Sequence, residues 1–252
     1  MLIDSHAHLD DKQYNGDRSA VIAEIKAAGV TNVINIGADM KSSRASVKLA
    51  EEFDFIYAVV GVHPHYAKSM TDSDIAELKA LAEHPKVVAI GEVGLDYYYE
   101  KSEKEEQKHW FRKQLQLAKE LNLPVVIHDR DAHSDCLEIL KSENISNGVM
   151  HCFSGGAEMV KTVIDMGLYI SLGGVITFKN ARVAIEALRA VPMEKLLLET
   201  DCPYLSPEPH RGKRNTPAYI PLIAQKIAEI KGISYGEVCR TAAENTKNLF
   251  GF

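Results

Sequence analysis

Histidine and acidic side chains recur along this chain at or just beyond the ends of short apolar segments that are typical of β-strands. The set comprises His6, His8, Glu92, His128, His151 and Asp201. Imidazole nitrogens and carboxylate oxygens are ligands of divalent ions such as zinc and manganese. Their repeated placement after strands predicts a metal site at one end of a parallel sheet.

Eight short apolar segments predict eight strands, and segments with a helical period lie between them. The expected strands are residues 2–5, 32–36, 55–60, 87–90, 124–127, 148–150, 168–171 and 195–198. Expected helices include residues 20–28 and 75–83, and the clearest carries apolar residues from Phe111 to Leu121 on one face. Strands that alternate with helices indicate a parallel sheet.

Such a sheet either closes into a TIM-type (β/α)8 barrel or stays open and doubly wound, and the strand count fits both. An open sheet concentrates its site near the point where the strand order reverses. Polar residues that follow strands one, four, five, six and eight converge only in a closed ring, which favours the α/β barrel. The chain has 252 residues, the usual size of one barrel, so we expect a single domain spanning residues 1–252.

Two further helices are expected after the eighth strand. Thr216 and Pro217 suit the N-cap and first position of a helix that ends near Gly232 and packs outside the barrel. Ser234 suits the N-cap of the last helix, and Glu237 would complete a capping box.

Composition and charge limit the classes of function. A net charge of −6 argues against a protein that wraps nucleic acid through overall basicity, although it leaves room for a local phosphate site. No apolar segment approaches the roughly 20 residues that span a bilayer. The N-terminus lacks the pattern of a secretory signal, so we expect a cytoplasmic protein. The four cysteines show no CxxC spacing, which favours reduced thiols.

The first histidines are two residues apart, so a strand would turn both imidazoles of His6 and His8 to the same side. Alone, this pair also fits two polar residues on a half-buried edge. Asp201 follows the eighth strand, which adjoins the first in a closed barrel, so we expect it beside these histidines. Glu199 is an alternative candidate for this role. Asp201 could instead cap a loop. Asp4 would lie deeper on the same face, where it could orient an imidazole.

A second group consists of Glu92, His128 and His151. Glu92 ends an otherwise apolar segment, where an unpaired carboxylate would be costly to bury. It either caps the next loop or bridges two metals with its two oxygens. His128 and His151 end the fifth and sixth strands, so the three residues form a set suited to a second metal with open positions for water and substrate.

Further residues near the expected barrel mouth fit substrate contacts. His63 follows the third strand, and Pro64 restricts its backbone. It either contacts the scissile phosphate, donates a proton to the leaving oxygen, or is a loop histidine bonded to the backbone. We interpret His65 as an ordinary surface residue.

Two other segments lie near the same mouth. The basic residues Arg211, Lys213 and Arg214 follow the eighth strand, where they would position phosphate, unless they form an ordinary solvated surface. Tyr97, Tyr98 and Tyr99 either stack on unpaired bases or cover the barrel.

These residues belong to segments that follow one another in a specific order. The segments are His6-Ala7-His8, Gly61-Val62-His63-Pro64, Gly91-Glu92-Val93-Gly94-Leu95-Asp96, His128, His151-Cys152-Phe153-Ser154-Gly155, Glu199-Thr200-Asp201-Cys202-Pro203 and Arg211-Gly212-Lys213-Arg214-Asn215. In this order and spacing they resemble the TatD family of metal-dependent deoxyribonucleases. The resemblance covers essentially the whole chain and shows no departure at the expected ligand positions. It implies a TIM-type barrel with two divalent metals, one held by His6, His8, Glu92 and Asp201, the other by Glu92, His128 and His151.

The resemblance also implies a 3′-5′ exonuclease that hydrolyses DNA, with a preference for single-stranded ends. The expected catalytic residues are Asp201, as acceptor of the attacking water's proton, Glu92 and His63. Zinc, manganese, magnesium or nickel would serve as the metal, and we expect a monomer with no membrane contact. The alternatives are a binuclear hydrolase of small amides, esters or phosphoesters and, more distantly, a non-catalytic DNA-binding protein.

Overall fold

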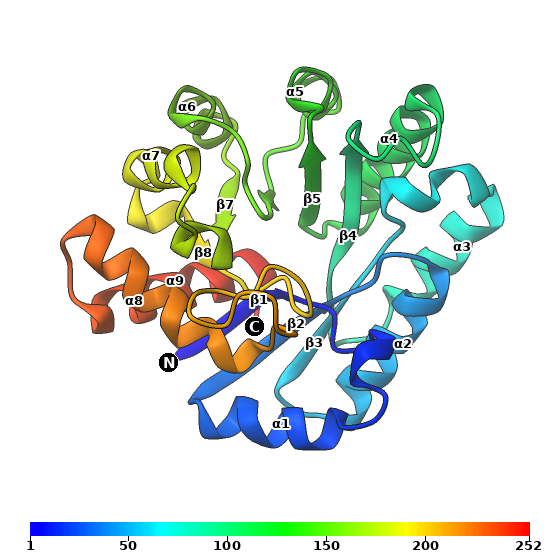
Figure 1. The fold of residues 1–252 in the computed structure, drawn as a ribbon. Helices are drawn as coiled ribbons and strands as arrows, with labels where there is room; N and C mark the ends of the chain where they lie inside the picture. The colour runs from blue at the N-terminus through cyan, green and yellow to red at the C-terminus, as the bar shows by residue number, and fades with distance from the viewer.

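Eight parallel strands, each hydrogen-bonded to the next in chain order, form the centre of the molecule (Figure 1). The computed structural model describes residues 1–252. The strands are β1 (Leu2–Ala7), β2 (Val30–Ile36), β3 (Ile56–Val60), β4 (Val87–Asp96), β5 (Val125–Arg130), β6 (Gly148–Met150), β7 (Tyr169–Leu172) and β8 (Leu196–Leu198).

The ring of strands is closed by backbone contacts between β1 and the segment that follows β8. Ala7 and Cys202 form a parallel bridge. The N–H of His8 donates to the carbonyl of Cys202 at 2.8 Å, and the N–H of Asp201 donates to the carbonyl of His6 at 2.9 Å. The chain therefore folds as a TIM-type barrel, as the placement of polar residues predicted.

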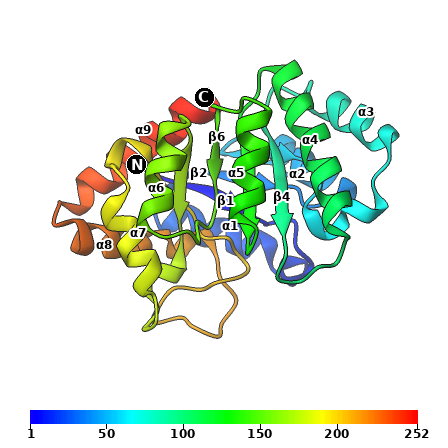
Figure 2. The same ribbon diagram turned by 90° about the horizontal axis from the view of Figure 1, so that it is seen from above.

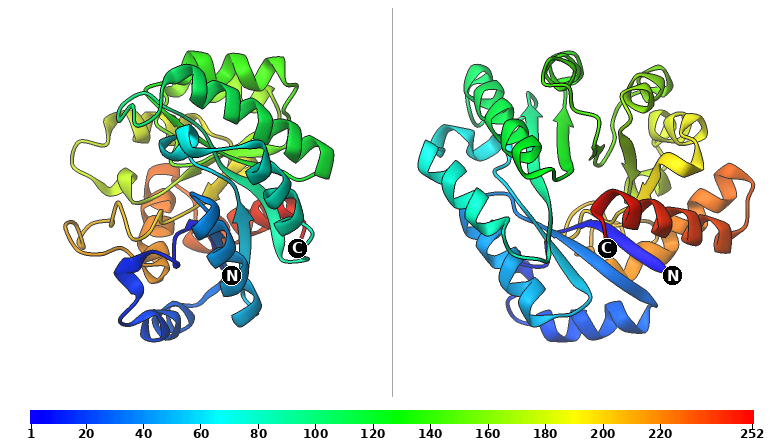
Figure 3. Two further views of the ribbon diagram at one scale, coloured as in Figure 1. Left: turned by 90° about the vertical axis from the view of Figure 1, so that its right-hand side faces the viewer. Right: turned by 180° about the vertical axis from the view of Figure 1, so that it is seen from behind.

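Helices surround the strands on the outside, as the view from above shows (Figure 2). They are α1 (Arg18–Ala27), α2 (Met40–Glu52), α3 (Asp72–Leu81), α4 (Lys104–Leu121), α5 (His133–Ser142), α6 (Ala157–Asp165), α7 (Arg182–Ala190), α8 (Ile220–Lys231) and α9 (Tyr235–Phe250). The two last helices lie beside the N-terminal strand (Figure 3). No helix combines the length and the apolar character needed to cross a bilayer.

Two apolar clusters hold this arrangement together. The larger one lies between the strands and the helices and includes Phe111 and Leu115 from α4. The smaller one joins buried strand residues such as Ile34 and Val126 to Leu249 and Phe250 of α9. Burial of these apolar side chains stabilises the barrel. The polar residues, in contrast, gather near the carboxyl ends of the strands.

The main difference from the expected elements is the length of β4 and β5. Both continue past the apolar residues, because Gly94 pairs with His128 and Asp96 pairs with Arg130. Gly94 has a φ of +147°, and a side chain there would overlap the carbonyl oxygen of His128. Glu92 and His128 therefore lie inside strands rather than beyond their ends, because β4 and β5 remain hydrogen-bonded to each other where their side chains become polar.

The C-terminal helices begin and end close to the expected residues. Thr216 caps a single 3-10 turn (Pro217–Tyr219), and α8 starts only at Ile220. Gly232 ends α8 with a φ of +68°. Ser234 caps α9 by accepting from the N–H of Glu237 at 3.1 Å, without the return bond of a capping box. None of the four cysteines forms a disulfide in the structure, and three of them are buried.

Candidate metal centre

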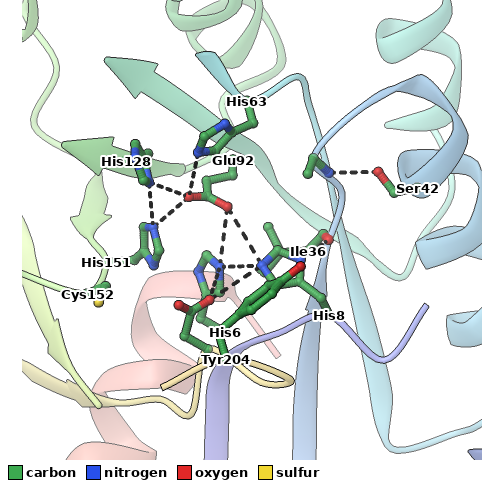
Figure 4. Close-up of polar contacts among 12 residues, drawn as sticks. His6, His8, Ile36, Ser42, His63, Glu92, His128, His151, Cys152 and Tyr204 are labelled. Carbon is green, nitrogen blue, oxygen red and sulfur yellow. Dashed lines mark hydrogen bonds and ion pairs between the residues drawn. The ribbon is translucent and has the colours of Figure 1, made fainter. Parts of the chain in front are cut away.

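One group of donors gathers where the barrel closes, and we call it the first donor group: His6, His8, Glu92 and Asp201. Figure 4 labels the first three of them. Nε2 of His6 lies 3.2 Å from Nε2 of His8. Oδ1 of Asp201 lies 3.7 Å from Nε2 of His6 and 3.5 Å from Nε2 of His8. Oε2 of Glu92 lies 3.5 Å from the same atom of His6 and 3.8 Å from that of His8.

These separations suit a tetrahedral metal ion. Four ligand atoms ~2.1 Å from a zinc ion stand ~3.4 Å apart from one another. Five pairs of donors in the first group lie 3.2 Å to 3.8 Å apart. The burial of Asp201 opposes ionisation, but the imidazoles of His8 and His6 lower the pKa of its carboxyl group, which keeps an ionised oxygen among the donors.

The second donor group, Glu92, His128 and His151, comes from β4, β5 and the residue after β6. Oε1 of Glu92 lies 2.7 Å from Nδ1 of His128 and 2.6 Å from Nε2 of His151. The two imidazole atoms are 3.3 Å apart. Two imidazoles and one carboxylate form a donor set suited to a second divalent ion.

Glu92 joins the two groups because its two carboxylate oxygens face different histidines. Oε1 faces His128 and His151, while Oε2 faces His6 and His8. The side chain is 5% exposed. Burial disfavours its charge, but the imidazoles around it, led by His151, hold the pKa of Glu92 well below its usual range. This geometry favours the bridging interpretation over that of a loop cap.

His63 lies three residues after β3 and points into the same site (Figure 4). Its Nε2 lies 3.6 Å from Oε1 of Glu92, and its ring stands 4.3 Å from that of His128. Its Nδ1 accepts a hydrogen bond from the backbone N–H of His65 at 3.1 Å. The ring proton is therefore on Nε2, facing the site.

Sequence reasoning missed the role of Asp96 and misread His65. Oδ2 of Asp96 lies 2.8 Å from Nε2 of His65 and 3.2 Å from Nε2 of His128. Its Oδ1 accepts from the backbone N–H groups of Tyr98 and Tyr99. His65 is thus part of a polar network rather than an ordinary surface residue. A signal was present, since Asp96 lies four residues beyond Glu92 on the same strand, with the alternation that turns both to one face.

Asp4 does not contact an imidazole, contrary to the expectation. Its Oδ1 accepts from the backbone N–H of His6 at 3.2 Å and from that of Thr200 at 3.0 Å. Asp4 therefore fastens β1 to the segment after β8 and stabilises the closure of the barrel instead of orienting a histidine.

Glu199, the competitor of Asp201, lies deeper than the donors. Its Oε1 accepts from the backbone N–H of Cys152 at 2.7 Å and lies 3.8 Å from Nδ1 of His151. The side chain is completely buried, and burial raises its pKa to about 7. The first donor group therefore contains Asp201 and not Glu199.

The basic residues after β8 differ in their contacts. Arg214 forms two hydrogen bonds to the carboxylate of Asp17, at 2.9 Å and 2.6 Å, so its guanidinium is occupied by an ion pair with the chain itself. Arg211 is exposed, with its guanidinium 3.8 Å from the centre of the Phe178 ring. Lys213 is exposed. Only Arg211 and Lys213 remain free for a phosphate.

The three consecutive tyrosines also differ. Tyr97 donates its hydroxyl to Asp135 and is partly buried. Tyr98 and Tyr99 are 58% and 51% exposed, with Tyr99 edge-on to His65 at 5.3 Å. The guanidinium of Arg130, a residue that sequence reasoning did not select, lies 4.2 Å from the Tyr98 ring and 4.9 Å from the Tyr99 ring. An aromatic and cationic rim therefore adjoins the second donor group.

Imidazole and carboxylate donors at the carboxyl ends of the strands of a closed (β/α)8 barrel form the kind of site that metal-dependent hydrolases use. The chain belongs to the family of TatD-related DNases, whose family model matches residues 3–251. The assignment confirms the resemblance found in the sequence motifs.

Individual relatives agree with this assignment. The chain is 47% identical over 252 residues to a Bacillus subtilis protein described only as the metal-dependent hydrolase YabD, with 99% of each chain covered. It is 36% identical over 258 residues to the 3′-5′ ssDNA/RNA exonuclease TatD of Escherichia fergusonii, again with 99% of each covered. The crystal structure of YjjV, a TatD homolog from Escherichia coli K12, matches with a TM-score of 0.95 and 30% identity, covering 100% of this chain and 98% of that one.

Proposed function

We propose that this protein is a metal-dependent exonuclease that removes nucleotides from the 3′ ends of single-stranded DNA. The observation that carries the proposal is the position of Glu92, whose two carboxylate oxygens face two separate groups of histidines. A relative that is 36% identical is named a 3′-5′ ssDNA/RNA exonuclease, which supports the polarity and the single-stranded substrate. We also propose a monomer as the active unit.

The cofactor that we propose is a pair of divalent cations, one in each donor group. Groups rich in imidazole favour zinc, manganese or nickel over magnesium, which prefers oxygen ligands. When bound, such a pair supplies activation of a water molecule and stabilisation of charge on the attacking and leaving oxygens of a phosphodiester.

Asp201 and His63 would move or hold protons during this reaction. Oδ1 of Asp201 faces His6 and His8, and the side chain is 15% exposed, so its other oxygen can accept the proton of the attacking water. The Nε2–H of His63 faces the site and can donate a hydrogen bond to a phosphate oxygen. The backbone bond expected of a loop histidine is present at Nδ1, and the Nε2–H that faces the site supports the phosphate contact as well.

The substrate strand would leave the metal centre over the rim formed by Tyr98, Tyr99 and Arg130. Exposed aromatic rings stack on unpaired bases without demanding a sequence, and a guanidinium neutralises phosphate charge. Arg211 and Lys213 supply further positive charge after β8. A base paired in a duplex cannot stack in this way, which accounts for the preference for single strands.

The test is hydrolysis by metal-reconstituted protein of three nucleic acids: single-stranded DNA labelled at its 5′ end, the same strand in a duplex, and the matching RNA. A ladder that shortens from the 3′ end, faster for the single strand than for the duplex, is expected, and the Glu92→Ala variant should produce none. A panel of small esters and amides is assayed in parallel. Activity on that panel alone would refute the nuclease assignment, and tight DNA binding without metal-dependent turnover would indicate a binding protein.

A further inference from the structure

Three buried polar atoms behind the donor groups have no hydrogen-bond partner: Nδ1 of His6, Nδ1 of His151 and Oε2 of Glu199. A buried polar atom left without a partner costs about 1–3 kcal/mol, so such atoms are normally satisfied by protein or by bound water. Three of them in neighbouring residues point to one shared partner.

The two imidazoles lie face to face, with ring centres 3.8 Å apart and planes 12° from parallel. Their Nε2 atoms lie on the side of Glu92, at 3.5 Å for His6 and 2.6 Å for His151. Since the two nitrogens of an imidazole lie at different edges of the ring, both Nδ1 atoms remain for contacts away from Glu92.

Glu199 lies on the Nδ1 side of this pair. It directly follows β8 and is held from a different loop by the backbone N–H of Cys152, the residue after His151. Oε1 lies 3.8 Å from Nδ1 of His151, too far for a direct hydrogen bond. One donor atom from each of His6, His151 and Glu199 lies within 4.8 Å of the other two. A water molecule ~2.8 Å from each of three atoms spans such a triangle.

We propose that Glu199 is a positioning residue shared by the two donor groups, acting on the Nδ1 edges of His6 and His151 through one bound water. The water accepts the Nδ1–H of both imidazoles and donates to the carboxylate of Glu199. This arrangement keeps the ring protons on Nδ1 and leaves both Nε2 lone pairs free for metal. The inference rests on the proposed metal centre but not on the substrate.

Loss of Glu199 should therefore differ from loss of Asp96 in its effect on the two metals. His6 belongs to the first donor group and His151 to the second, so loss of Glu199 weakens both metals. Asp96 contacts a metal-donor histidine only in the second group, through His128. Partners of metal-ligand histidines typically change metal affinity by about 10- to 100-fold.

The experiment is a titration of the chelator-treated protein with ¹¹³Cd²⁺, followed by calorimetry and by ¹¹³Cd NMR, in which two bound ions give two resonances. Glu199→Gln keeps the size of the side chain and an oxygen for the N–H of Cys152, and Asp96→Asn is the matched control. We expect Glu199→Gln to weaken both sites about 10- to 100-fold and to shift both resonances, while Asp96→Asn affects one. Wild-type affinity in Glu199→Gln, or a loss confined to one site, would overturn the proposal.

A second measurement needs no variant and so does not depend on how Glu199→Gln folds. ¹⁵N NMR of the loaded wild-type protein should show His6 and His151 as Nδ1–H tautomers whose protons exchange slowly with solvent. Unprotected Nδ1 protons, or protons on Nε2, would also overturn it. Neither readout uses DNA, so a protein that meets both expectations but leaves DNA intact would contradict only the proposed nuclease function.

Discussion

The carboxylate of Asp96 lies 3.2 Å from Nε2 of His128, the ring nitrogen on the opposite side from Glu92. As an acceptor, it holds the ring proton of His128 on Nε2 and leaves Nδ1 with a lone pair for metal. The backbone N–H groups of Tyr98 and Tyr99 fix this carboxylate in turn. The strand that carries Glu92 thus also orients a histidine of the neighbouring strand.

Replacing Asp96 with asparagine should therefore weaken the second metal about 10- to 100-fold and leave the first metal unchanged, because the amide can present its NH2 group to His128. Isothermal titration of the metal-free protein with zinc measures both affinities. Asp129→Asn is a matched control, since Asp129 lies next to His128 in the chain but pairs with His133 instead. Two tight zinc ions in Asp96→Asn would show that Asp96 has no such role.

The positions of the donors could be predicted because they depend on strand order and on the alternation of side chains. The placement of Asp201 beside His6 follows from closure of the barrel, which the bonds between Asp201 and His6 and between His8 and Cys202 now show. The two faces of Glu92 could likewise be anticipated, because a carboxylate that emerges from an apolar strand needs partners.

The contacts of Asp4, Arg214 and Glu199 could not be predicted, because each depends on residues far away in the sequence. Arg214 reaches Asp17 across the barrel closure, and Asp4 meets Thr200. A basic run or a buried acid looks the same in the sequence whether its partner is a ligand or another part of the chain. The extension of β4 was missed because Gly94 and Asp96 are poor strand formers, yet pairing with β5 keeps both extended.

Replacing Asp201 with asparagine should reduce turnover of single-stranded DNA by about 10²- to 10⁴-fold, the usual contribution of a positioned proton acceptor. The amide keeps an oxygen that can face His6 and His8, so the fold and much of the metal binding should persist. Single-turnover kinetics with metal content measured in the same samples would check this. Near wild-type turnover in a fully loaded variant would remove Asp201 from the reaction.

The two arginines after β8 should separate into different roles. Arg211→Glu should raise the KM for single-stranded DNA several-fold with little change in kcat or melting temperature, because Arg211 is exposed and has no ion-pair partner. Arg214→Ala should lower the melting temperature slightly, because it breaks the ion pair with Asp17. Steady-state kinetics and thermal unfolding of both variants test this, and the reverse pattern would assign the phosphate contact to Arg214.

The rim should contribute to binding through the faces of its rings. Tyr98→Ala should weaken the binding of single-stranded DNA about 5- to 150-fold, corresponding to about 1–3 kcal/mol for one stacked base, whereas Tyr98→Phe should bind as wild type. Fluorescence anisotropy with a labelled oligonucleotide and an inactive Glu92→Ala background measures this without cleavage. Equal losses in both Tyr98 variants would point to the hydroxyl, and no loss in either would exclude stacking at Tyr98.

The metal-free protein should lose stability as the pH rises from about 7 to 10. Burial lowers the pKa of His8, but Asp201 and Glu92 outweigh burial and raise this pKa to about 10. For His128, burial is likewise outweighed by Asp96 and Glu92, which raise the pKa to about 9. Because histidines of the unfolded chain have a pKa of about 6.5, the folded protein binds more protons than the unfolded chain between about pH 7 and pH 10. The stabilisation is therefore complete below about pH 6.5 and is lost as the pH rises through the folded values.

Bound metal should reverse this trend, because metal binding requires deprotonated imidazoles and therefore strengthens as protons leave. Urea unfolding at several pH values, once with a chelator and once with saturating zinc, gives the two curves of unfolding free energy. The difference between them should widen from pH 7 to pH 9. Parallel curves would mean that the histidines of the donor groups do not exchange protons for metal, which would contradict their assignment as ligands.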